Sequence, residues 1–347
     1  MKVLGLISSL TDPASRARII QYKDYFAASG NTLAPRFFTP LKDADPAPWT
    51  YKLKKITGIN EWTSFDLMKT IGRVPLHFAQ AGFDLIWQNR LIQLHHSYWE
   101  TKLRKPVVFD FDDAIWFNEG EKEVIKKIQQ SAMIFAGNEY LADYASKYNK
   151  NTFIIPTTVD TTKLFPLKKK ASCFTIGWIG TKSNFQYLEI MKSAVLDFLL
   201  QNQDACLVIV SSEKPDQFNF DDKQIIFRYW NQETENLVIN EFSVGLMPLA
   251  DTEWTKGKCS YKMLQYMACG KPVIVSPVGM NNKLLTADTI GVAANNTVGW
   301  LNAFNTLKND NDFHTTCSLN GRNLVEKNYS VAIYTPVIIN HFKKLLG

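Results

Sequence analysis

Short apolar segments alternate with helical patterns along the whole chain of 347 residues. This alternation predicts parallel β-sheets covered by helices, because a parallel connection needs a crossover about as long as a helix. We therefore expect an α/β protein of the doubly wound kind. The expected strands are 3–7, 33–38, 85–87, 107–111, 133–136, 152–155, 174–179, 206–210, 225–229, 242–247 and 273–275, and the expected helices are 17–28, 121–130, 186–200, 233–240 and 259–268.

The length favours two domains, since single hydrophobic cores rarely grow beyond about 250–300 residues. A polar connector at 165–172, which holds Pro166 and a run of three lysines, separates two sets of strands. We predict an N-terminal domain over 1–166, a C-terminal domain over 171–328 and a final amphipathic helix over 329–347 that packs back toward the first domain. Two such domains would face each other across a cleft at the carboxyl ends of their strands.

Composition narrows the class of protein. No apolar run reaches the roughly 18 residues of a membrane span, and the first segment is better explained as a buried strand than as a signal peptide. The five cysteines form no CxxC pair, so we expect reduced thiols in a cytoplasmic protein. The histidines have no metal-ligand spacing, and we expect no metal cofactor. A net charge of +6 permits anionic ligands or an acidic membrane face, but there is no basic arm for nucleic acid.

The stretch 256–279 combines two glycine turns, a helix and a strand. Gly257 and Ser260 open the predicted helix, and Gly270 ends it as a left-handed cap before Pro272, where a helix cannot continue. Residues 273–275 then form a short buried strand. The start of this helix is the first candidate site, because the unpaired N–H groups of a helix N-terminus attract anions.

Lysines surround that helix start. Lys258 and Lys262 are four residues apart and share one face of the helix, so they favour contact with a diphosphate. The alternative is that they only solvate the helix end. Gln265 lies among apolar neighbours, where it hydrogen-bonds a ribose hydroxyl or faces solvent.

Two further segments of the C-terminal half are ligand candidates. The turn after strand 174–179 contains Gly180, Thr181 and Lys182, whose N–H groups, hydroxyl and ammonium suit a phosphate, although an ordinary capped turn explains them as well. The motif is not a Walker loop. Tyr229 and Trp230 lie at the end of another strand and are candidates to wall a nucleobase, the alternative being core and rim packing.

Carboxylates and arginines mark the N-terminal half. Asp110 and Asp112 alternate at the end of strand 107–111 and are ligand-facing candidates, and metal binding is possible for this cluster. The alternative is that Asp113 caps the following turn and Asp110 pairs with a nearby Arg or Lys. Arg16 and Arg18 follow the first strand, and their guanidinium groups suit phosphate or carboxylate on an acceptor. A surface ion pair is the alternative for these arginines.

One segment mixes aromatic and basic residues, as interfacial elements do. One hypothesis is that it makes peripheral contact with the inner face of a membrane, and the other is that it forms an ordinary domain face. Its members are Trp49, Tyr51, Lys52, Lys54, Lys55, Trp62 and Phe65.

Together these segments resemble the retaining glycosyltransferases of family 4, the group 1 transferases of GT-B fold. The resemblance extends over nearly the whole chain in the order of that family. It lies in the stretches SRARIIQY, VVFDFDDAIW, AGNEYLADYA with IIPTTVDTTKL, and KGKCSYKMLQYMACGKPVIVSPVG.

The resemblance implies two Rossmann-like domains facing across a cleft, the first for a glycan or lipid-linked acceptor and the second for a nucleotide sugar. It places the turn 180–182 by the diphosphate, and Gly257, Lys258 and Lys262 around the sugar and phosphates of the donor. Gln265 occupies the second glutamate position of the E-x7-E motif of the family, and Gly257 the first, so this chain lacks both glutamates. Asp112 aligns with a polar residue that contacts the transferred sugar.

The expected reaction is transfer of a sugar from a nucleoside diphosphate sugar to a hydroxyl with retention, in bacterial glycan or polysaccharide biosynthesis. Lys182, Lys258, Lys262 and the dipole of the helix would stabilise the leaving diphosphate. One alternative is a sugar-nucleotide hydrolase or epimerase, for which Asp112 is the candidate base. Another is a non-catalytic binding protein, which the missing glutamates favour.

Overall fold

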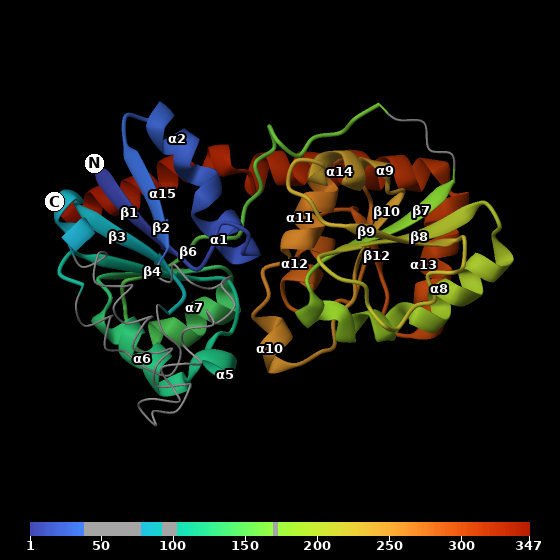
Figure 1. Ribbon diagram of the computed structural model, residues 1–347, viewed down its shortest axis with the longest axis horizontal. Coiled ribbons are helices and arrows are strands. Elements are labelled where there is room, and N and C mark those ends of the chain that lie inside the picture. Colours follow the sequence, from blue (N-terminus) through green and yellow to red (C-terminus); the bar gives the residue numbers. More distant parts are fainter. Residues whose placement is uncertain (38–77, 92–102, 169–172) are drawn as a thin grey trace, which may run out of the picture. The chain divides into compact units, whose positions relative to one another are not determined.

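The computed structural model describes residues 1–37, 78–91, 103–168 and 173–347, and these form two compact units (Figure 1). The first unit comprises Met1–Ile155 and Thr335–Gly347, and the second comprises Pro156–Tyr334. The boundary therefore lies upstream of the predicted connector. Phe165 and Leu167 already belong to the second unit, because the Asn240 side chain bonds the Phe165 carbonyl (2.9 Å) and the Leu167 N–H (2.8 Å).

The first unit is built on a sheet of six parallel strands in the order β2-β1-β3-β4-β5-β6. All residues of β3, β4 and β5 are buried, as expected of strands covered on both faces. Four of the six predicted strands differ from these bounds by one or two residues, and the other two match. The strands are β1 (Lys2–Ile7), β2 (Thr32–Phe37), β3 (Leu85–Asn89), β4 (Val107–Phe111), β5 (Met133–Ala136) and β6 (Thr152–Ile154).

The predicted single helix over 17–28 is wrong. The chain forms α1 (Pro13–Arg18), a 3-10 turn η1 (Ile20–Tyr22) and α2 (Lys23–Ala28) instead. The helix breaks at Ile19, whose side chain is buried so close to the first strand that a Cβ on Gly5 would lie 2.8 Å from it. Among the residues that the structure describes, the other helical elements of this unit are η2 (Gln80–Gly82), α5 (Trp116–Glu119), α6 (Glu121–Gln130), α7 (Glu139–Ser146) and, from Thr335 onward, α15 (Val331–Leu346).

Aromatic rings fill one face of the first sheet. Trp87 of β3 contacts Phe26 of α2 and Phe342 of α15, with ring centroids 6.1 and 5.4 Å apart. Phe135 of β5 stacks on Phe342 at 5.7 Å. The last helix is thus part of the core of this unit.

The second unit contains a sheet of six parallel strands in the order β12-β11-β10-β7-β8-β9. The strand β12, a three-residue edge strand that begins with a glycine, was not predicted from the sequence. A Cβ at Gly291 would lie 1.9 Å from the Val273 carbonyl oxygen. The strands are β7 (Phe174–Ile179), β8 (Ala205–Ser211), β9 (Ile225–Tyr229), β10 (Val244–Met247), β11 (Val273–Val275) and β12 (Gly291–Ala293).

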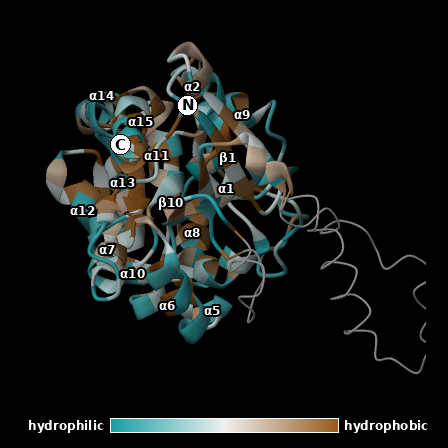
Figure 2. Ribbon diagram, turned by 90° about the vertical axis from the view of Figure 1, so that its left-hand side faces the viewer, coloured by the Kyte–Doolittle hydropathy of each residue, from teal (hydrophilic) through white to brown (hydrophobic). Residues whose placement is uncertain are grey.

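Alternate residues of each strand supply two separate cores. On β8, Leu207 and Ile209 face the cluster that contains α8 (Glu189–Gln201) and α13 (Thr297–Asn309), whereas Val208 and Val210 face the cluster with α11 (Tyr261–Ala268). Figure 2 shows β10 in hydrophobic colours and α6 of the first unit as largely hydrophilic. The remaining elements are η4 (Lys182–Leu188), α9 (Glu235–Glu241), α10 (Glu253–Lys256), α12 (Met280–Ala287) and α14 (Asn311–Asn328).

Within the described ranges, no helix is both long and apolar enough to cross a membrane. The seven aromatic and basic residues between Trp49 and Phe65 proposed for membrane contact lie outside the described residues, so that prediction stays a prediction.

Candidate functional site

The carboxyl ends of β7 and β10 form the topological switch point of the second sheet, where ligands bind in open α/β folds. Gly180 follows β7 directly, and its N–H donates to the Val210 carbonyl of β8 at 3.0 Å. A Cβ on Gly180 would lie 2.5 Å from the Trp178 ring and 2.9 Å from Cε of Lys262. The glycine therefore allows the lysine of α11 to reach the end of β7, which brings two of the predicted ligand segments together.

Tyr266, which lies inside the predicted helix 259–268, fixes α11 on this edge. Its buried hydroxyl accepts from the Ile179 N–H (3.0 Å) and donates to the Leu246 carbonyl (3.3 Å). Gly245 makes room for the ring, since a Cβ there would lie 2.2 Å from it. One side chain thus joins α11 to both strands of the switch point.

The turn before α11 has a well-defined shape. Gly257 is the C-cap of α10, and Ser260 is the N-cap of α11 with a left-handed φ of 55°. The buried Ser260 hydroxyl donates to Oδ1 of Asn281 at 2.6 Å, so it serves the fold of the turn. Gly270 has the predicted left-handed conformation, with a φ of 66°.

Each of the two lysines at the helix start lies near a tryptophan ring. The Lys262 ammonium lies 5.8 Å from the Trp178 ring centroid, and the Lys258 ammonium lies 5.1 Å from that of Trp254. These are cation–π distances. The two rings therefore help to fix the positions of both ammonium groups at this edge.

Lys182 has a different environment. Its side chain is 71% exposed and forms an ion pair with the exposed Glu213 at 2.8 Å, whose hydrogen bond and charge raise the pKa of the lysine. Thr181 lies in the same turn, where its Oγ1 is 3.0 Å from Oγ of Ser183 and accepts from the Asn184 amide. The segment is an exposed polar turn at the end of β7.

The remaining donor candidates lie in contrasting places. Tyr229, at the end of β9, is 72% exposed. The Trp230 indole donates to Glu235 at 2.9 Å and its ring packs on the core. Gln265 is only 3% exposed, so the option that it faces solvent is wrong. Ser211, which was not predicted from the sequence, ends β8, and its buried hydroxyl has no hydrogen-bond partner among the described residues.

In the first unit, Arg18 and Asp110 form a buried ion pair. Nε and Nη2 of Arg18 donate to the two carboxylate oxygens at 2.8 and 3.1 Å, and the Trp87 indole adds a third bond at 2.9 Å. Arg18 is 1% exposed and Asp110 is fully buried. The alternative that Asp110 pairs with a nearby arginine is confirmed, and the Arg18 guanidinium is committed to the interior. Arg16 lies half-buried on α1.

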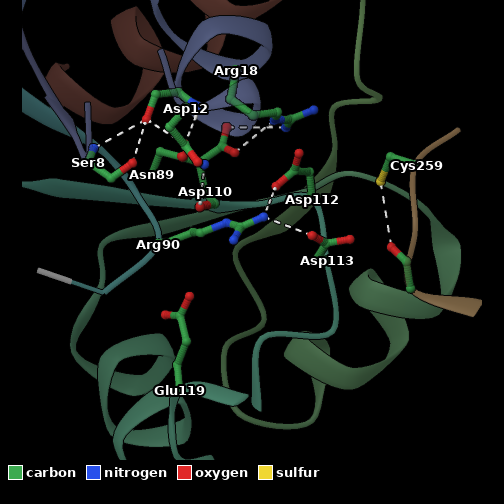
Figure 3. A network of polar contacts seen from close by, with 12 residues as sticks. Ser8, Asp12, Arg18, Asn89, Arg90, Asp110, Asp112, Asp113, Glu119 and Cys259 are labelled. Carbon is green, nitrogen blue, oxygen red and sulfur yellow. Dashed lines mark hydrogen bonds and ion pairs between the residues drawn. The ribbon is translucent and has the colours of Figure 1, made fainter. Parts of the chain in front are cut away.

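Arg90 organises a second cluster at the same edge (Figure 3). It follows β3 with a left-handed φ of 62°, uncommon for a residue with a side chain. Its Nη2 lies 3.3 Å from Asp112 and 2.8 Å from Asp113. Arg90 was not predicted as a site residue, because its only signal in the sequence is an arginine directly after a buried strand.

Burial perturbs the carboxylates around Arg90. Burial raises the pKa of Asp112, although the charge of Arg90 acts to lower it. Burial also raises the pKa of Glu119 to about 7, although the charge of Arg90 and the hydrogen bond from the Leu91 N–H act to lower it. Asp12 responds in the opposite sense. Burial opposes ionisation there, but the Arg90 charge and the Ser15 N–H lower its pKa. Among the described residues no cluster of His, Cys, Asp and Glu is arranged to hold a metal ion.

A family model matches part of the second unit. Residues 173–310 match the family model "Glycosyl transferases group 1". No curated protein sequence matches the chain significantly.

Solved structures match over almost the full length. Sucrose-phosphate synthase from Thermosynechococcus elongatus has a TM-score of 0.73 at 16% identity, with 99% of each chain covered. Anabaena Alr3699/HepE has a TM-score of 0.69 at 13% identity, covering 99% of this chain and 100% of its own. A glycosyltransferase from Rickettsia africae has a TM-score of 0.68 at 12% identity, covering 99% and 98%. The predicted GT-B fold, with two Rossmann-like domains, is therefore confirmed.

Proposed function

We propose that this protein is a glycosyltransferase that moves a sugar from a nucleoside diphosphate sugar to an acceptor hydroxyl with retention at the anomeric carbon. The observation that carries the proposal is the meeting of Gly180 with Lys262 at the switch point, within the segment that matches the group 1 family model. The Alr3699/HepE neighbour was crystallised with UDP-glucose, which makes a uridine diphosphate sugar the first donor to test.

The proposed chemistry is electrostatic. The bond between the anomeric carbon and the diphosphate oxygen breaks while charge grows on the diphosphate. Lys258, Lys262 and the N-terminus of α11 stabilise that charge. The two tryptophan rings hold the lysines in place before the reaction, so little reorganisation is needed when the charge develops. No metal is required by this scheme.

We assign the acceptor to the first unit, where the Arg90–Asp112–Asp113 cluster presents hydrogen-bonding groups suited to sugar hydroxyls. Asp112 is the candidate base there, since its raised pKa favours proton uptake. The acceptor is a glycan or a lipid-linked glycan of a bacterial pathway. Peripheral membrane contact through the segment around Trp49 and Phe65 belongs to the same proposal, and sedimentation with acidic liposomes at low salt tests it.

A binding protein without activity is the second candidate. Gln265 and Gly257 stand where related transferases have glutamates, and Gln265 is buried rather than exposed. Because a neutral amide holds a ribose less firmly than a carboxylate does, donor affinity and turnover must be measured separately.

Thermal unfolding of the full chain with nucleotide sugars tests the proposal first. A donor present at 100 times its Kd stabilises the folded state by about 2.7 kcal/mol, which raises the unfolding midpoint. Free glucose is the control and should leave the midpoint unchanged. Donors that bind are then assayed for release of nucleoside diphosphate with and without acceptor glycans. Release of free sugar without acceptor indicates a hydrolase, and binding without turnover indicates the second candidate. If no nucleotide sugar shifts the midpoint, the proposed function is wrong.

A further inference from the structure

Two cysteines of the second unit meet at the start of its first strand, away from the candidate site. Cys173 precedes β7, and Cys206 lies on β8. The register pairs Thr175 with Cys206. Because strand side chains alternate between faces, Cys173 and Thr175 point to the same side, and both reach Cys206.

The thiols are in direct contact. The two sulfur atoms are 3.2 Å apart. The Thr175 hydroxyl lies 3.4 Å from Sγ of Cys173 and 3.6 Å from Sγ of Cys206. A disulfide has an S–S bond of about 2.05 Å, so the atoms must approach by a little more than 1 Å. Both cysteines are free thiols in the structure and form no disulfide.

The two thiols differ in access. Cys173 is half-buried, whereas Cys206 is buried and packs into the core beside Val208. Burial raises the pKa of the Cys206 thiol to about 11, so it is protonated at neutral pH. An oxidant from solution therefore meets Cys173 first, and Cys206 is placed to complete the reaction.

We infer that Cys173 and Cys206 are a redox-active pair that closes to a disulfide by exchange with a small-molecule disulfide. The Cys173 thiolate attacks one sulfur of the reagent, forms a mixed disulfide and releases the first thiol. Cys206 loses its proton and attacks the Cys173 sulfur, which releases the second thiol. In balance, two protein thiols and one disulfide give one protein disulfide and two small thiols.

Closure would tie the residue that enters β7 to the neighbouring strand. The two residues are 33 positions apart in sequence, so the bridge would restrict a long loop of the unfolded chain. Such bridges stabilise folded domains mainly through that restriction. This inference is independent of the proposed transferase activity.

The test uses the reduced full-length protein and glutathione disulfide. After incubation, free thiols are alkylated and the digested protein is analysed by mass spectrometry without reduction. We expect a cross-linked peptide pair joining Cys173 and Cys206. Cys259, Cys269 and Cys317 should be recovered in alkylated form, because they remain thiols during the incubation. The oxidised protein should unfold several degrees higher than the reduced protein.

Variants separate the two steps. Cys206→Ser should stop at a glutathione adduct on Cys173, and Cys173→Ser should leave Cys206 as a thiol. Cys206→Ala is the second choice if the serine variant folds poorly, and Cys317→Ser is the matched control that keeps the cross-link. The inference is overturned if the wild-type protein stops at the glutathione adduct on Cys173. It is also overturned if both wild-type thiols remain unmodified under conditions in which Cys206→Ser forms that adduct.

Discussion

The carboxyl edges of the two sheets hold their cations in opposite ways. In the first unit, Arg18 is buried against Asp110, and Arg90 lies between Asp112 and Asp113. In the second unit, Lys258 and Lys262 lie over tryptophan rings. Carboxylates of the fold hold the arginines of the first edge, and tryptophan rings help to position the lysines of the second. We therefore expect loss of a buried arginine to lower stability most, and loss of a helix-start lysine to lower donor turnover most.

The largest expected effect comes from removing the buried guanidinium of the first unit. Arg18→Ala leaves the Asp110 carboxylate buried without its bidentate partner, and we expect a loss of about 3–5 kcal/mol in the free energy of unfolding. Urea unfolding followed by circular dichroism measures it. Arg16→Ala, two residues away on the same helix, is the control and should lose less than about 1 kcal/mol. Equal losses in the two variants would mean that the contrast between the two edges is wrong.

The second prediction concerns the pH dependence that Glu119 gives to the first unit. Its pKa is raised from 4.5 in the unfolded chain to about 7 in the folded protein. The folded state therefore keeps a proton that the unfolded state releases, so this group's contribution to stability is present below pH 4.5 and is lost as the pH rises through 7. Integrated over that window, the loss amounts to about 3 kcal/mol at most.

Comparison with Glu119→Gln isolates this contribution, because other titrating groups are common to both proteins. The stability of the wild type relative to Glu119→Gln should decline between pH 4.5 and pH 7. Asp143→Asn, at an exposed position on α7, should keep the slope of the wild type. Parallel stability curves for the wild type and Glu119→Gln would contradict the assignment.

The third prediction tests the contact between the two ligand segments of the second unit. Gly180→Ala places a methyl group 2.5 Å from the buried Trp178 ring and 2.9 Å from Lys262. We expect a loss of about 1–3 kcal/mol in stability, as for other overpacked sites, and weaker binding of the nucleotide sugar. Gly299→Ala is the control, because its new methyl group would come no closer than 3.4 Å to its neighbours. If Gly180→Ala binds the donor with wild-type affinity, Gly180 is not part of the donor site.

Local sequence predicted the strands well. Short apolar runs bounded by polar or turn residues mark strands, and β4, β5, β7, β9 and β11 begin and end as predicted. The failures have tertiary causes. The helix over 17–28 breaks because Ile19 packs against Gly5, and β12 is an edge strand with too few apolar residues to show.

The candidate site was predictable to the extent that it is local. The spacing of Lys258 and Lys262 is visible in the sequence, and so is the turn at Gly180. The Tyr266 hydroxyl bonds a backbone group 87 positions away, and Arg18 meets Asp110 across 92 positions. Residues so distant in sequence become partners only because the tertiary fold brings them together. For this reason Arg18 was expected at an acceptor, although the alternative pairing for Asp110 had been recognised.

The last prediction compares cations within the second edge. Lys262→Ala and Lys258→Ala should each lower turnover about tenfold, which corresponds to roughly 1.4 kcal/mol of barrier. Lys182→Ala should have a smaller effect, because that ammonium is 71% exposed and already paired with Glu213. Lys223→Ala, at an exposed position remote in sequence from these segments, is the control. If both helix-start variants retain full turnover, the diphosphate role of these lysines is wrong. If Lys182→Ala has the largest effect, the ring-held lysines position the helix and the exposed one carries the electrostatic role.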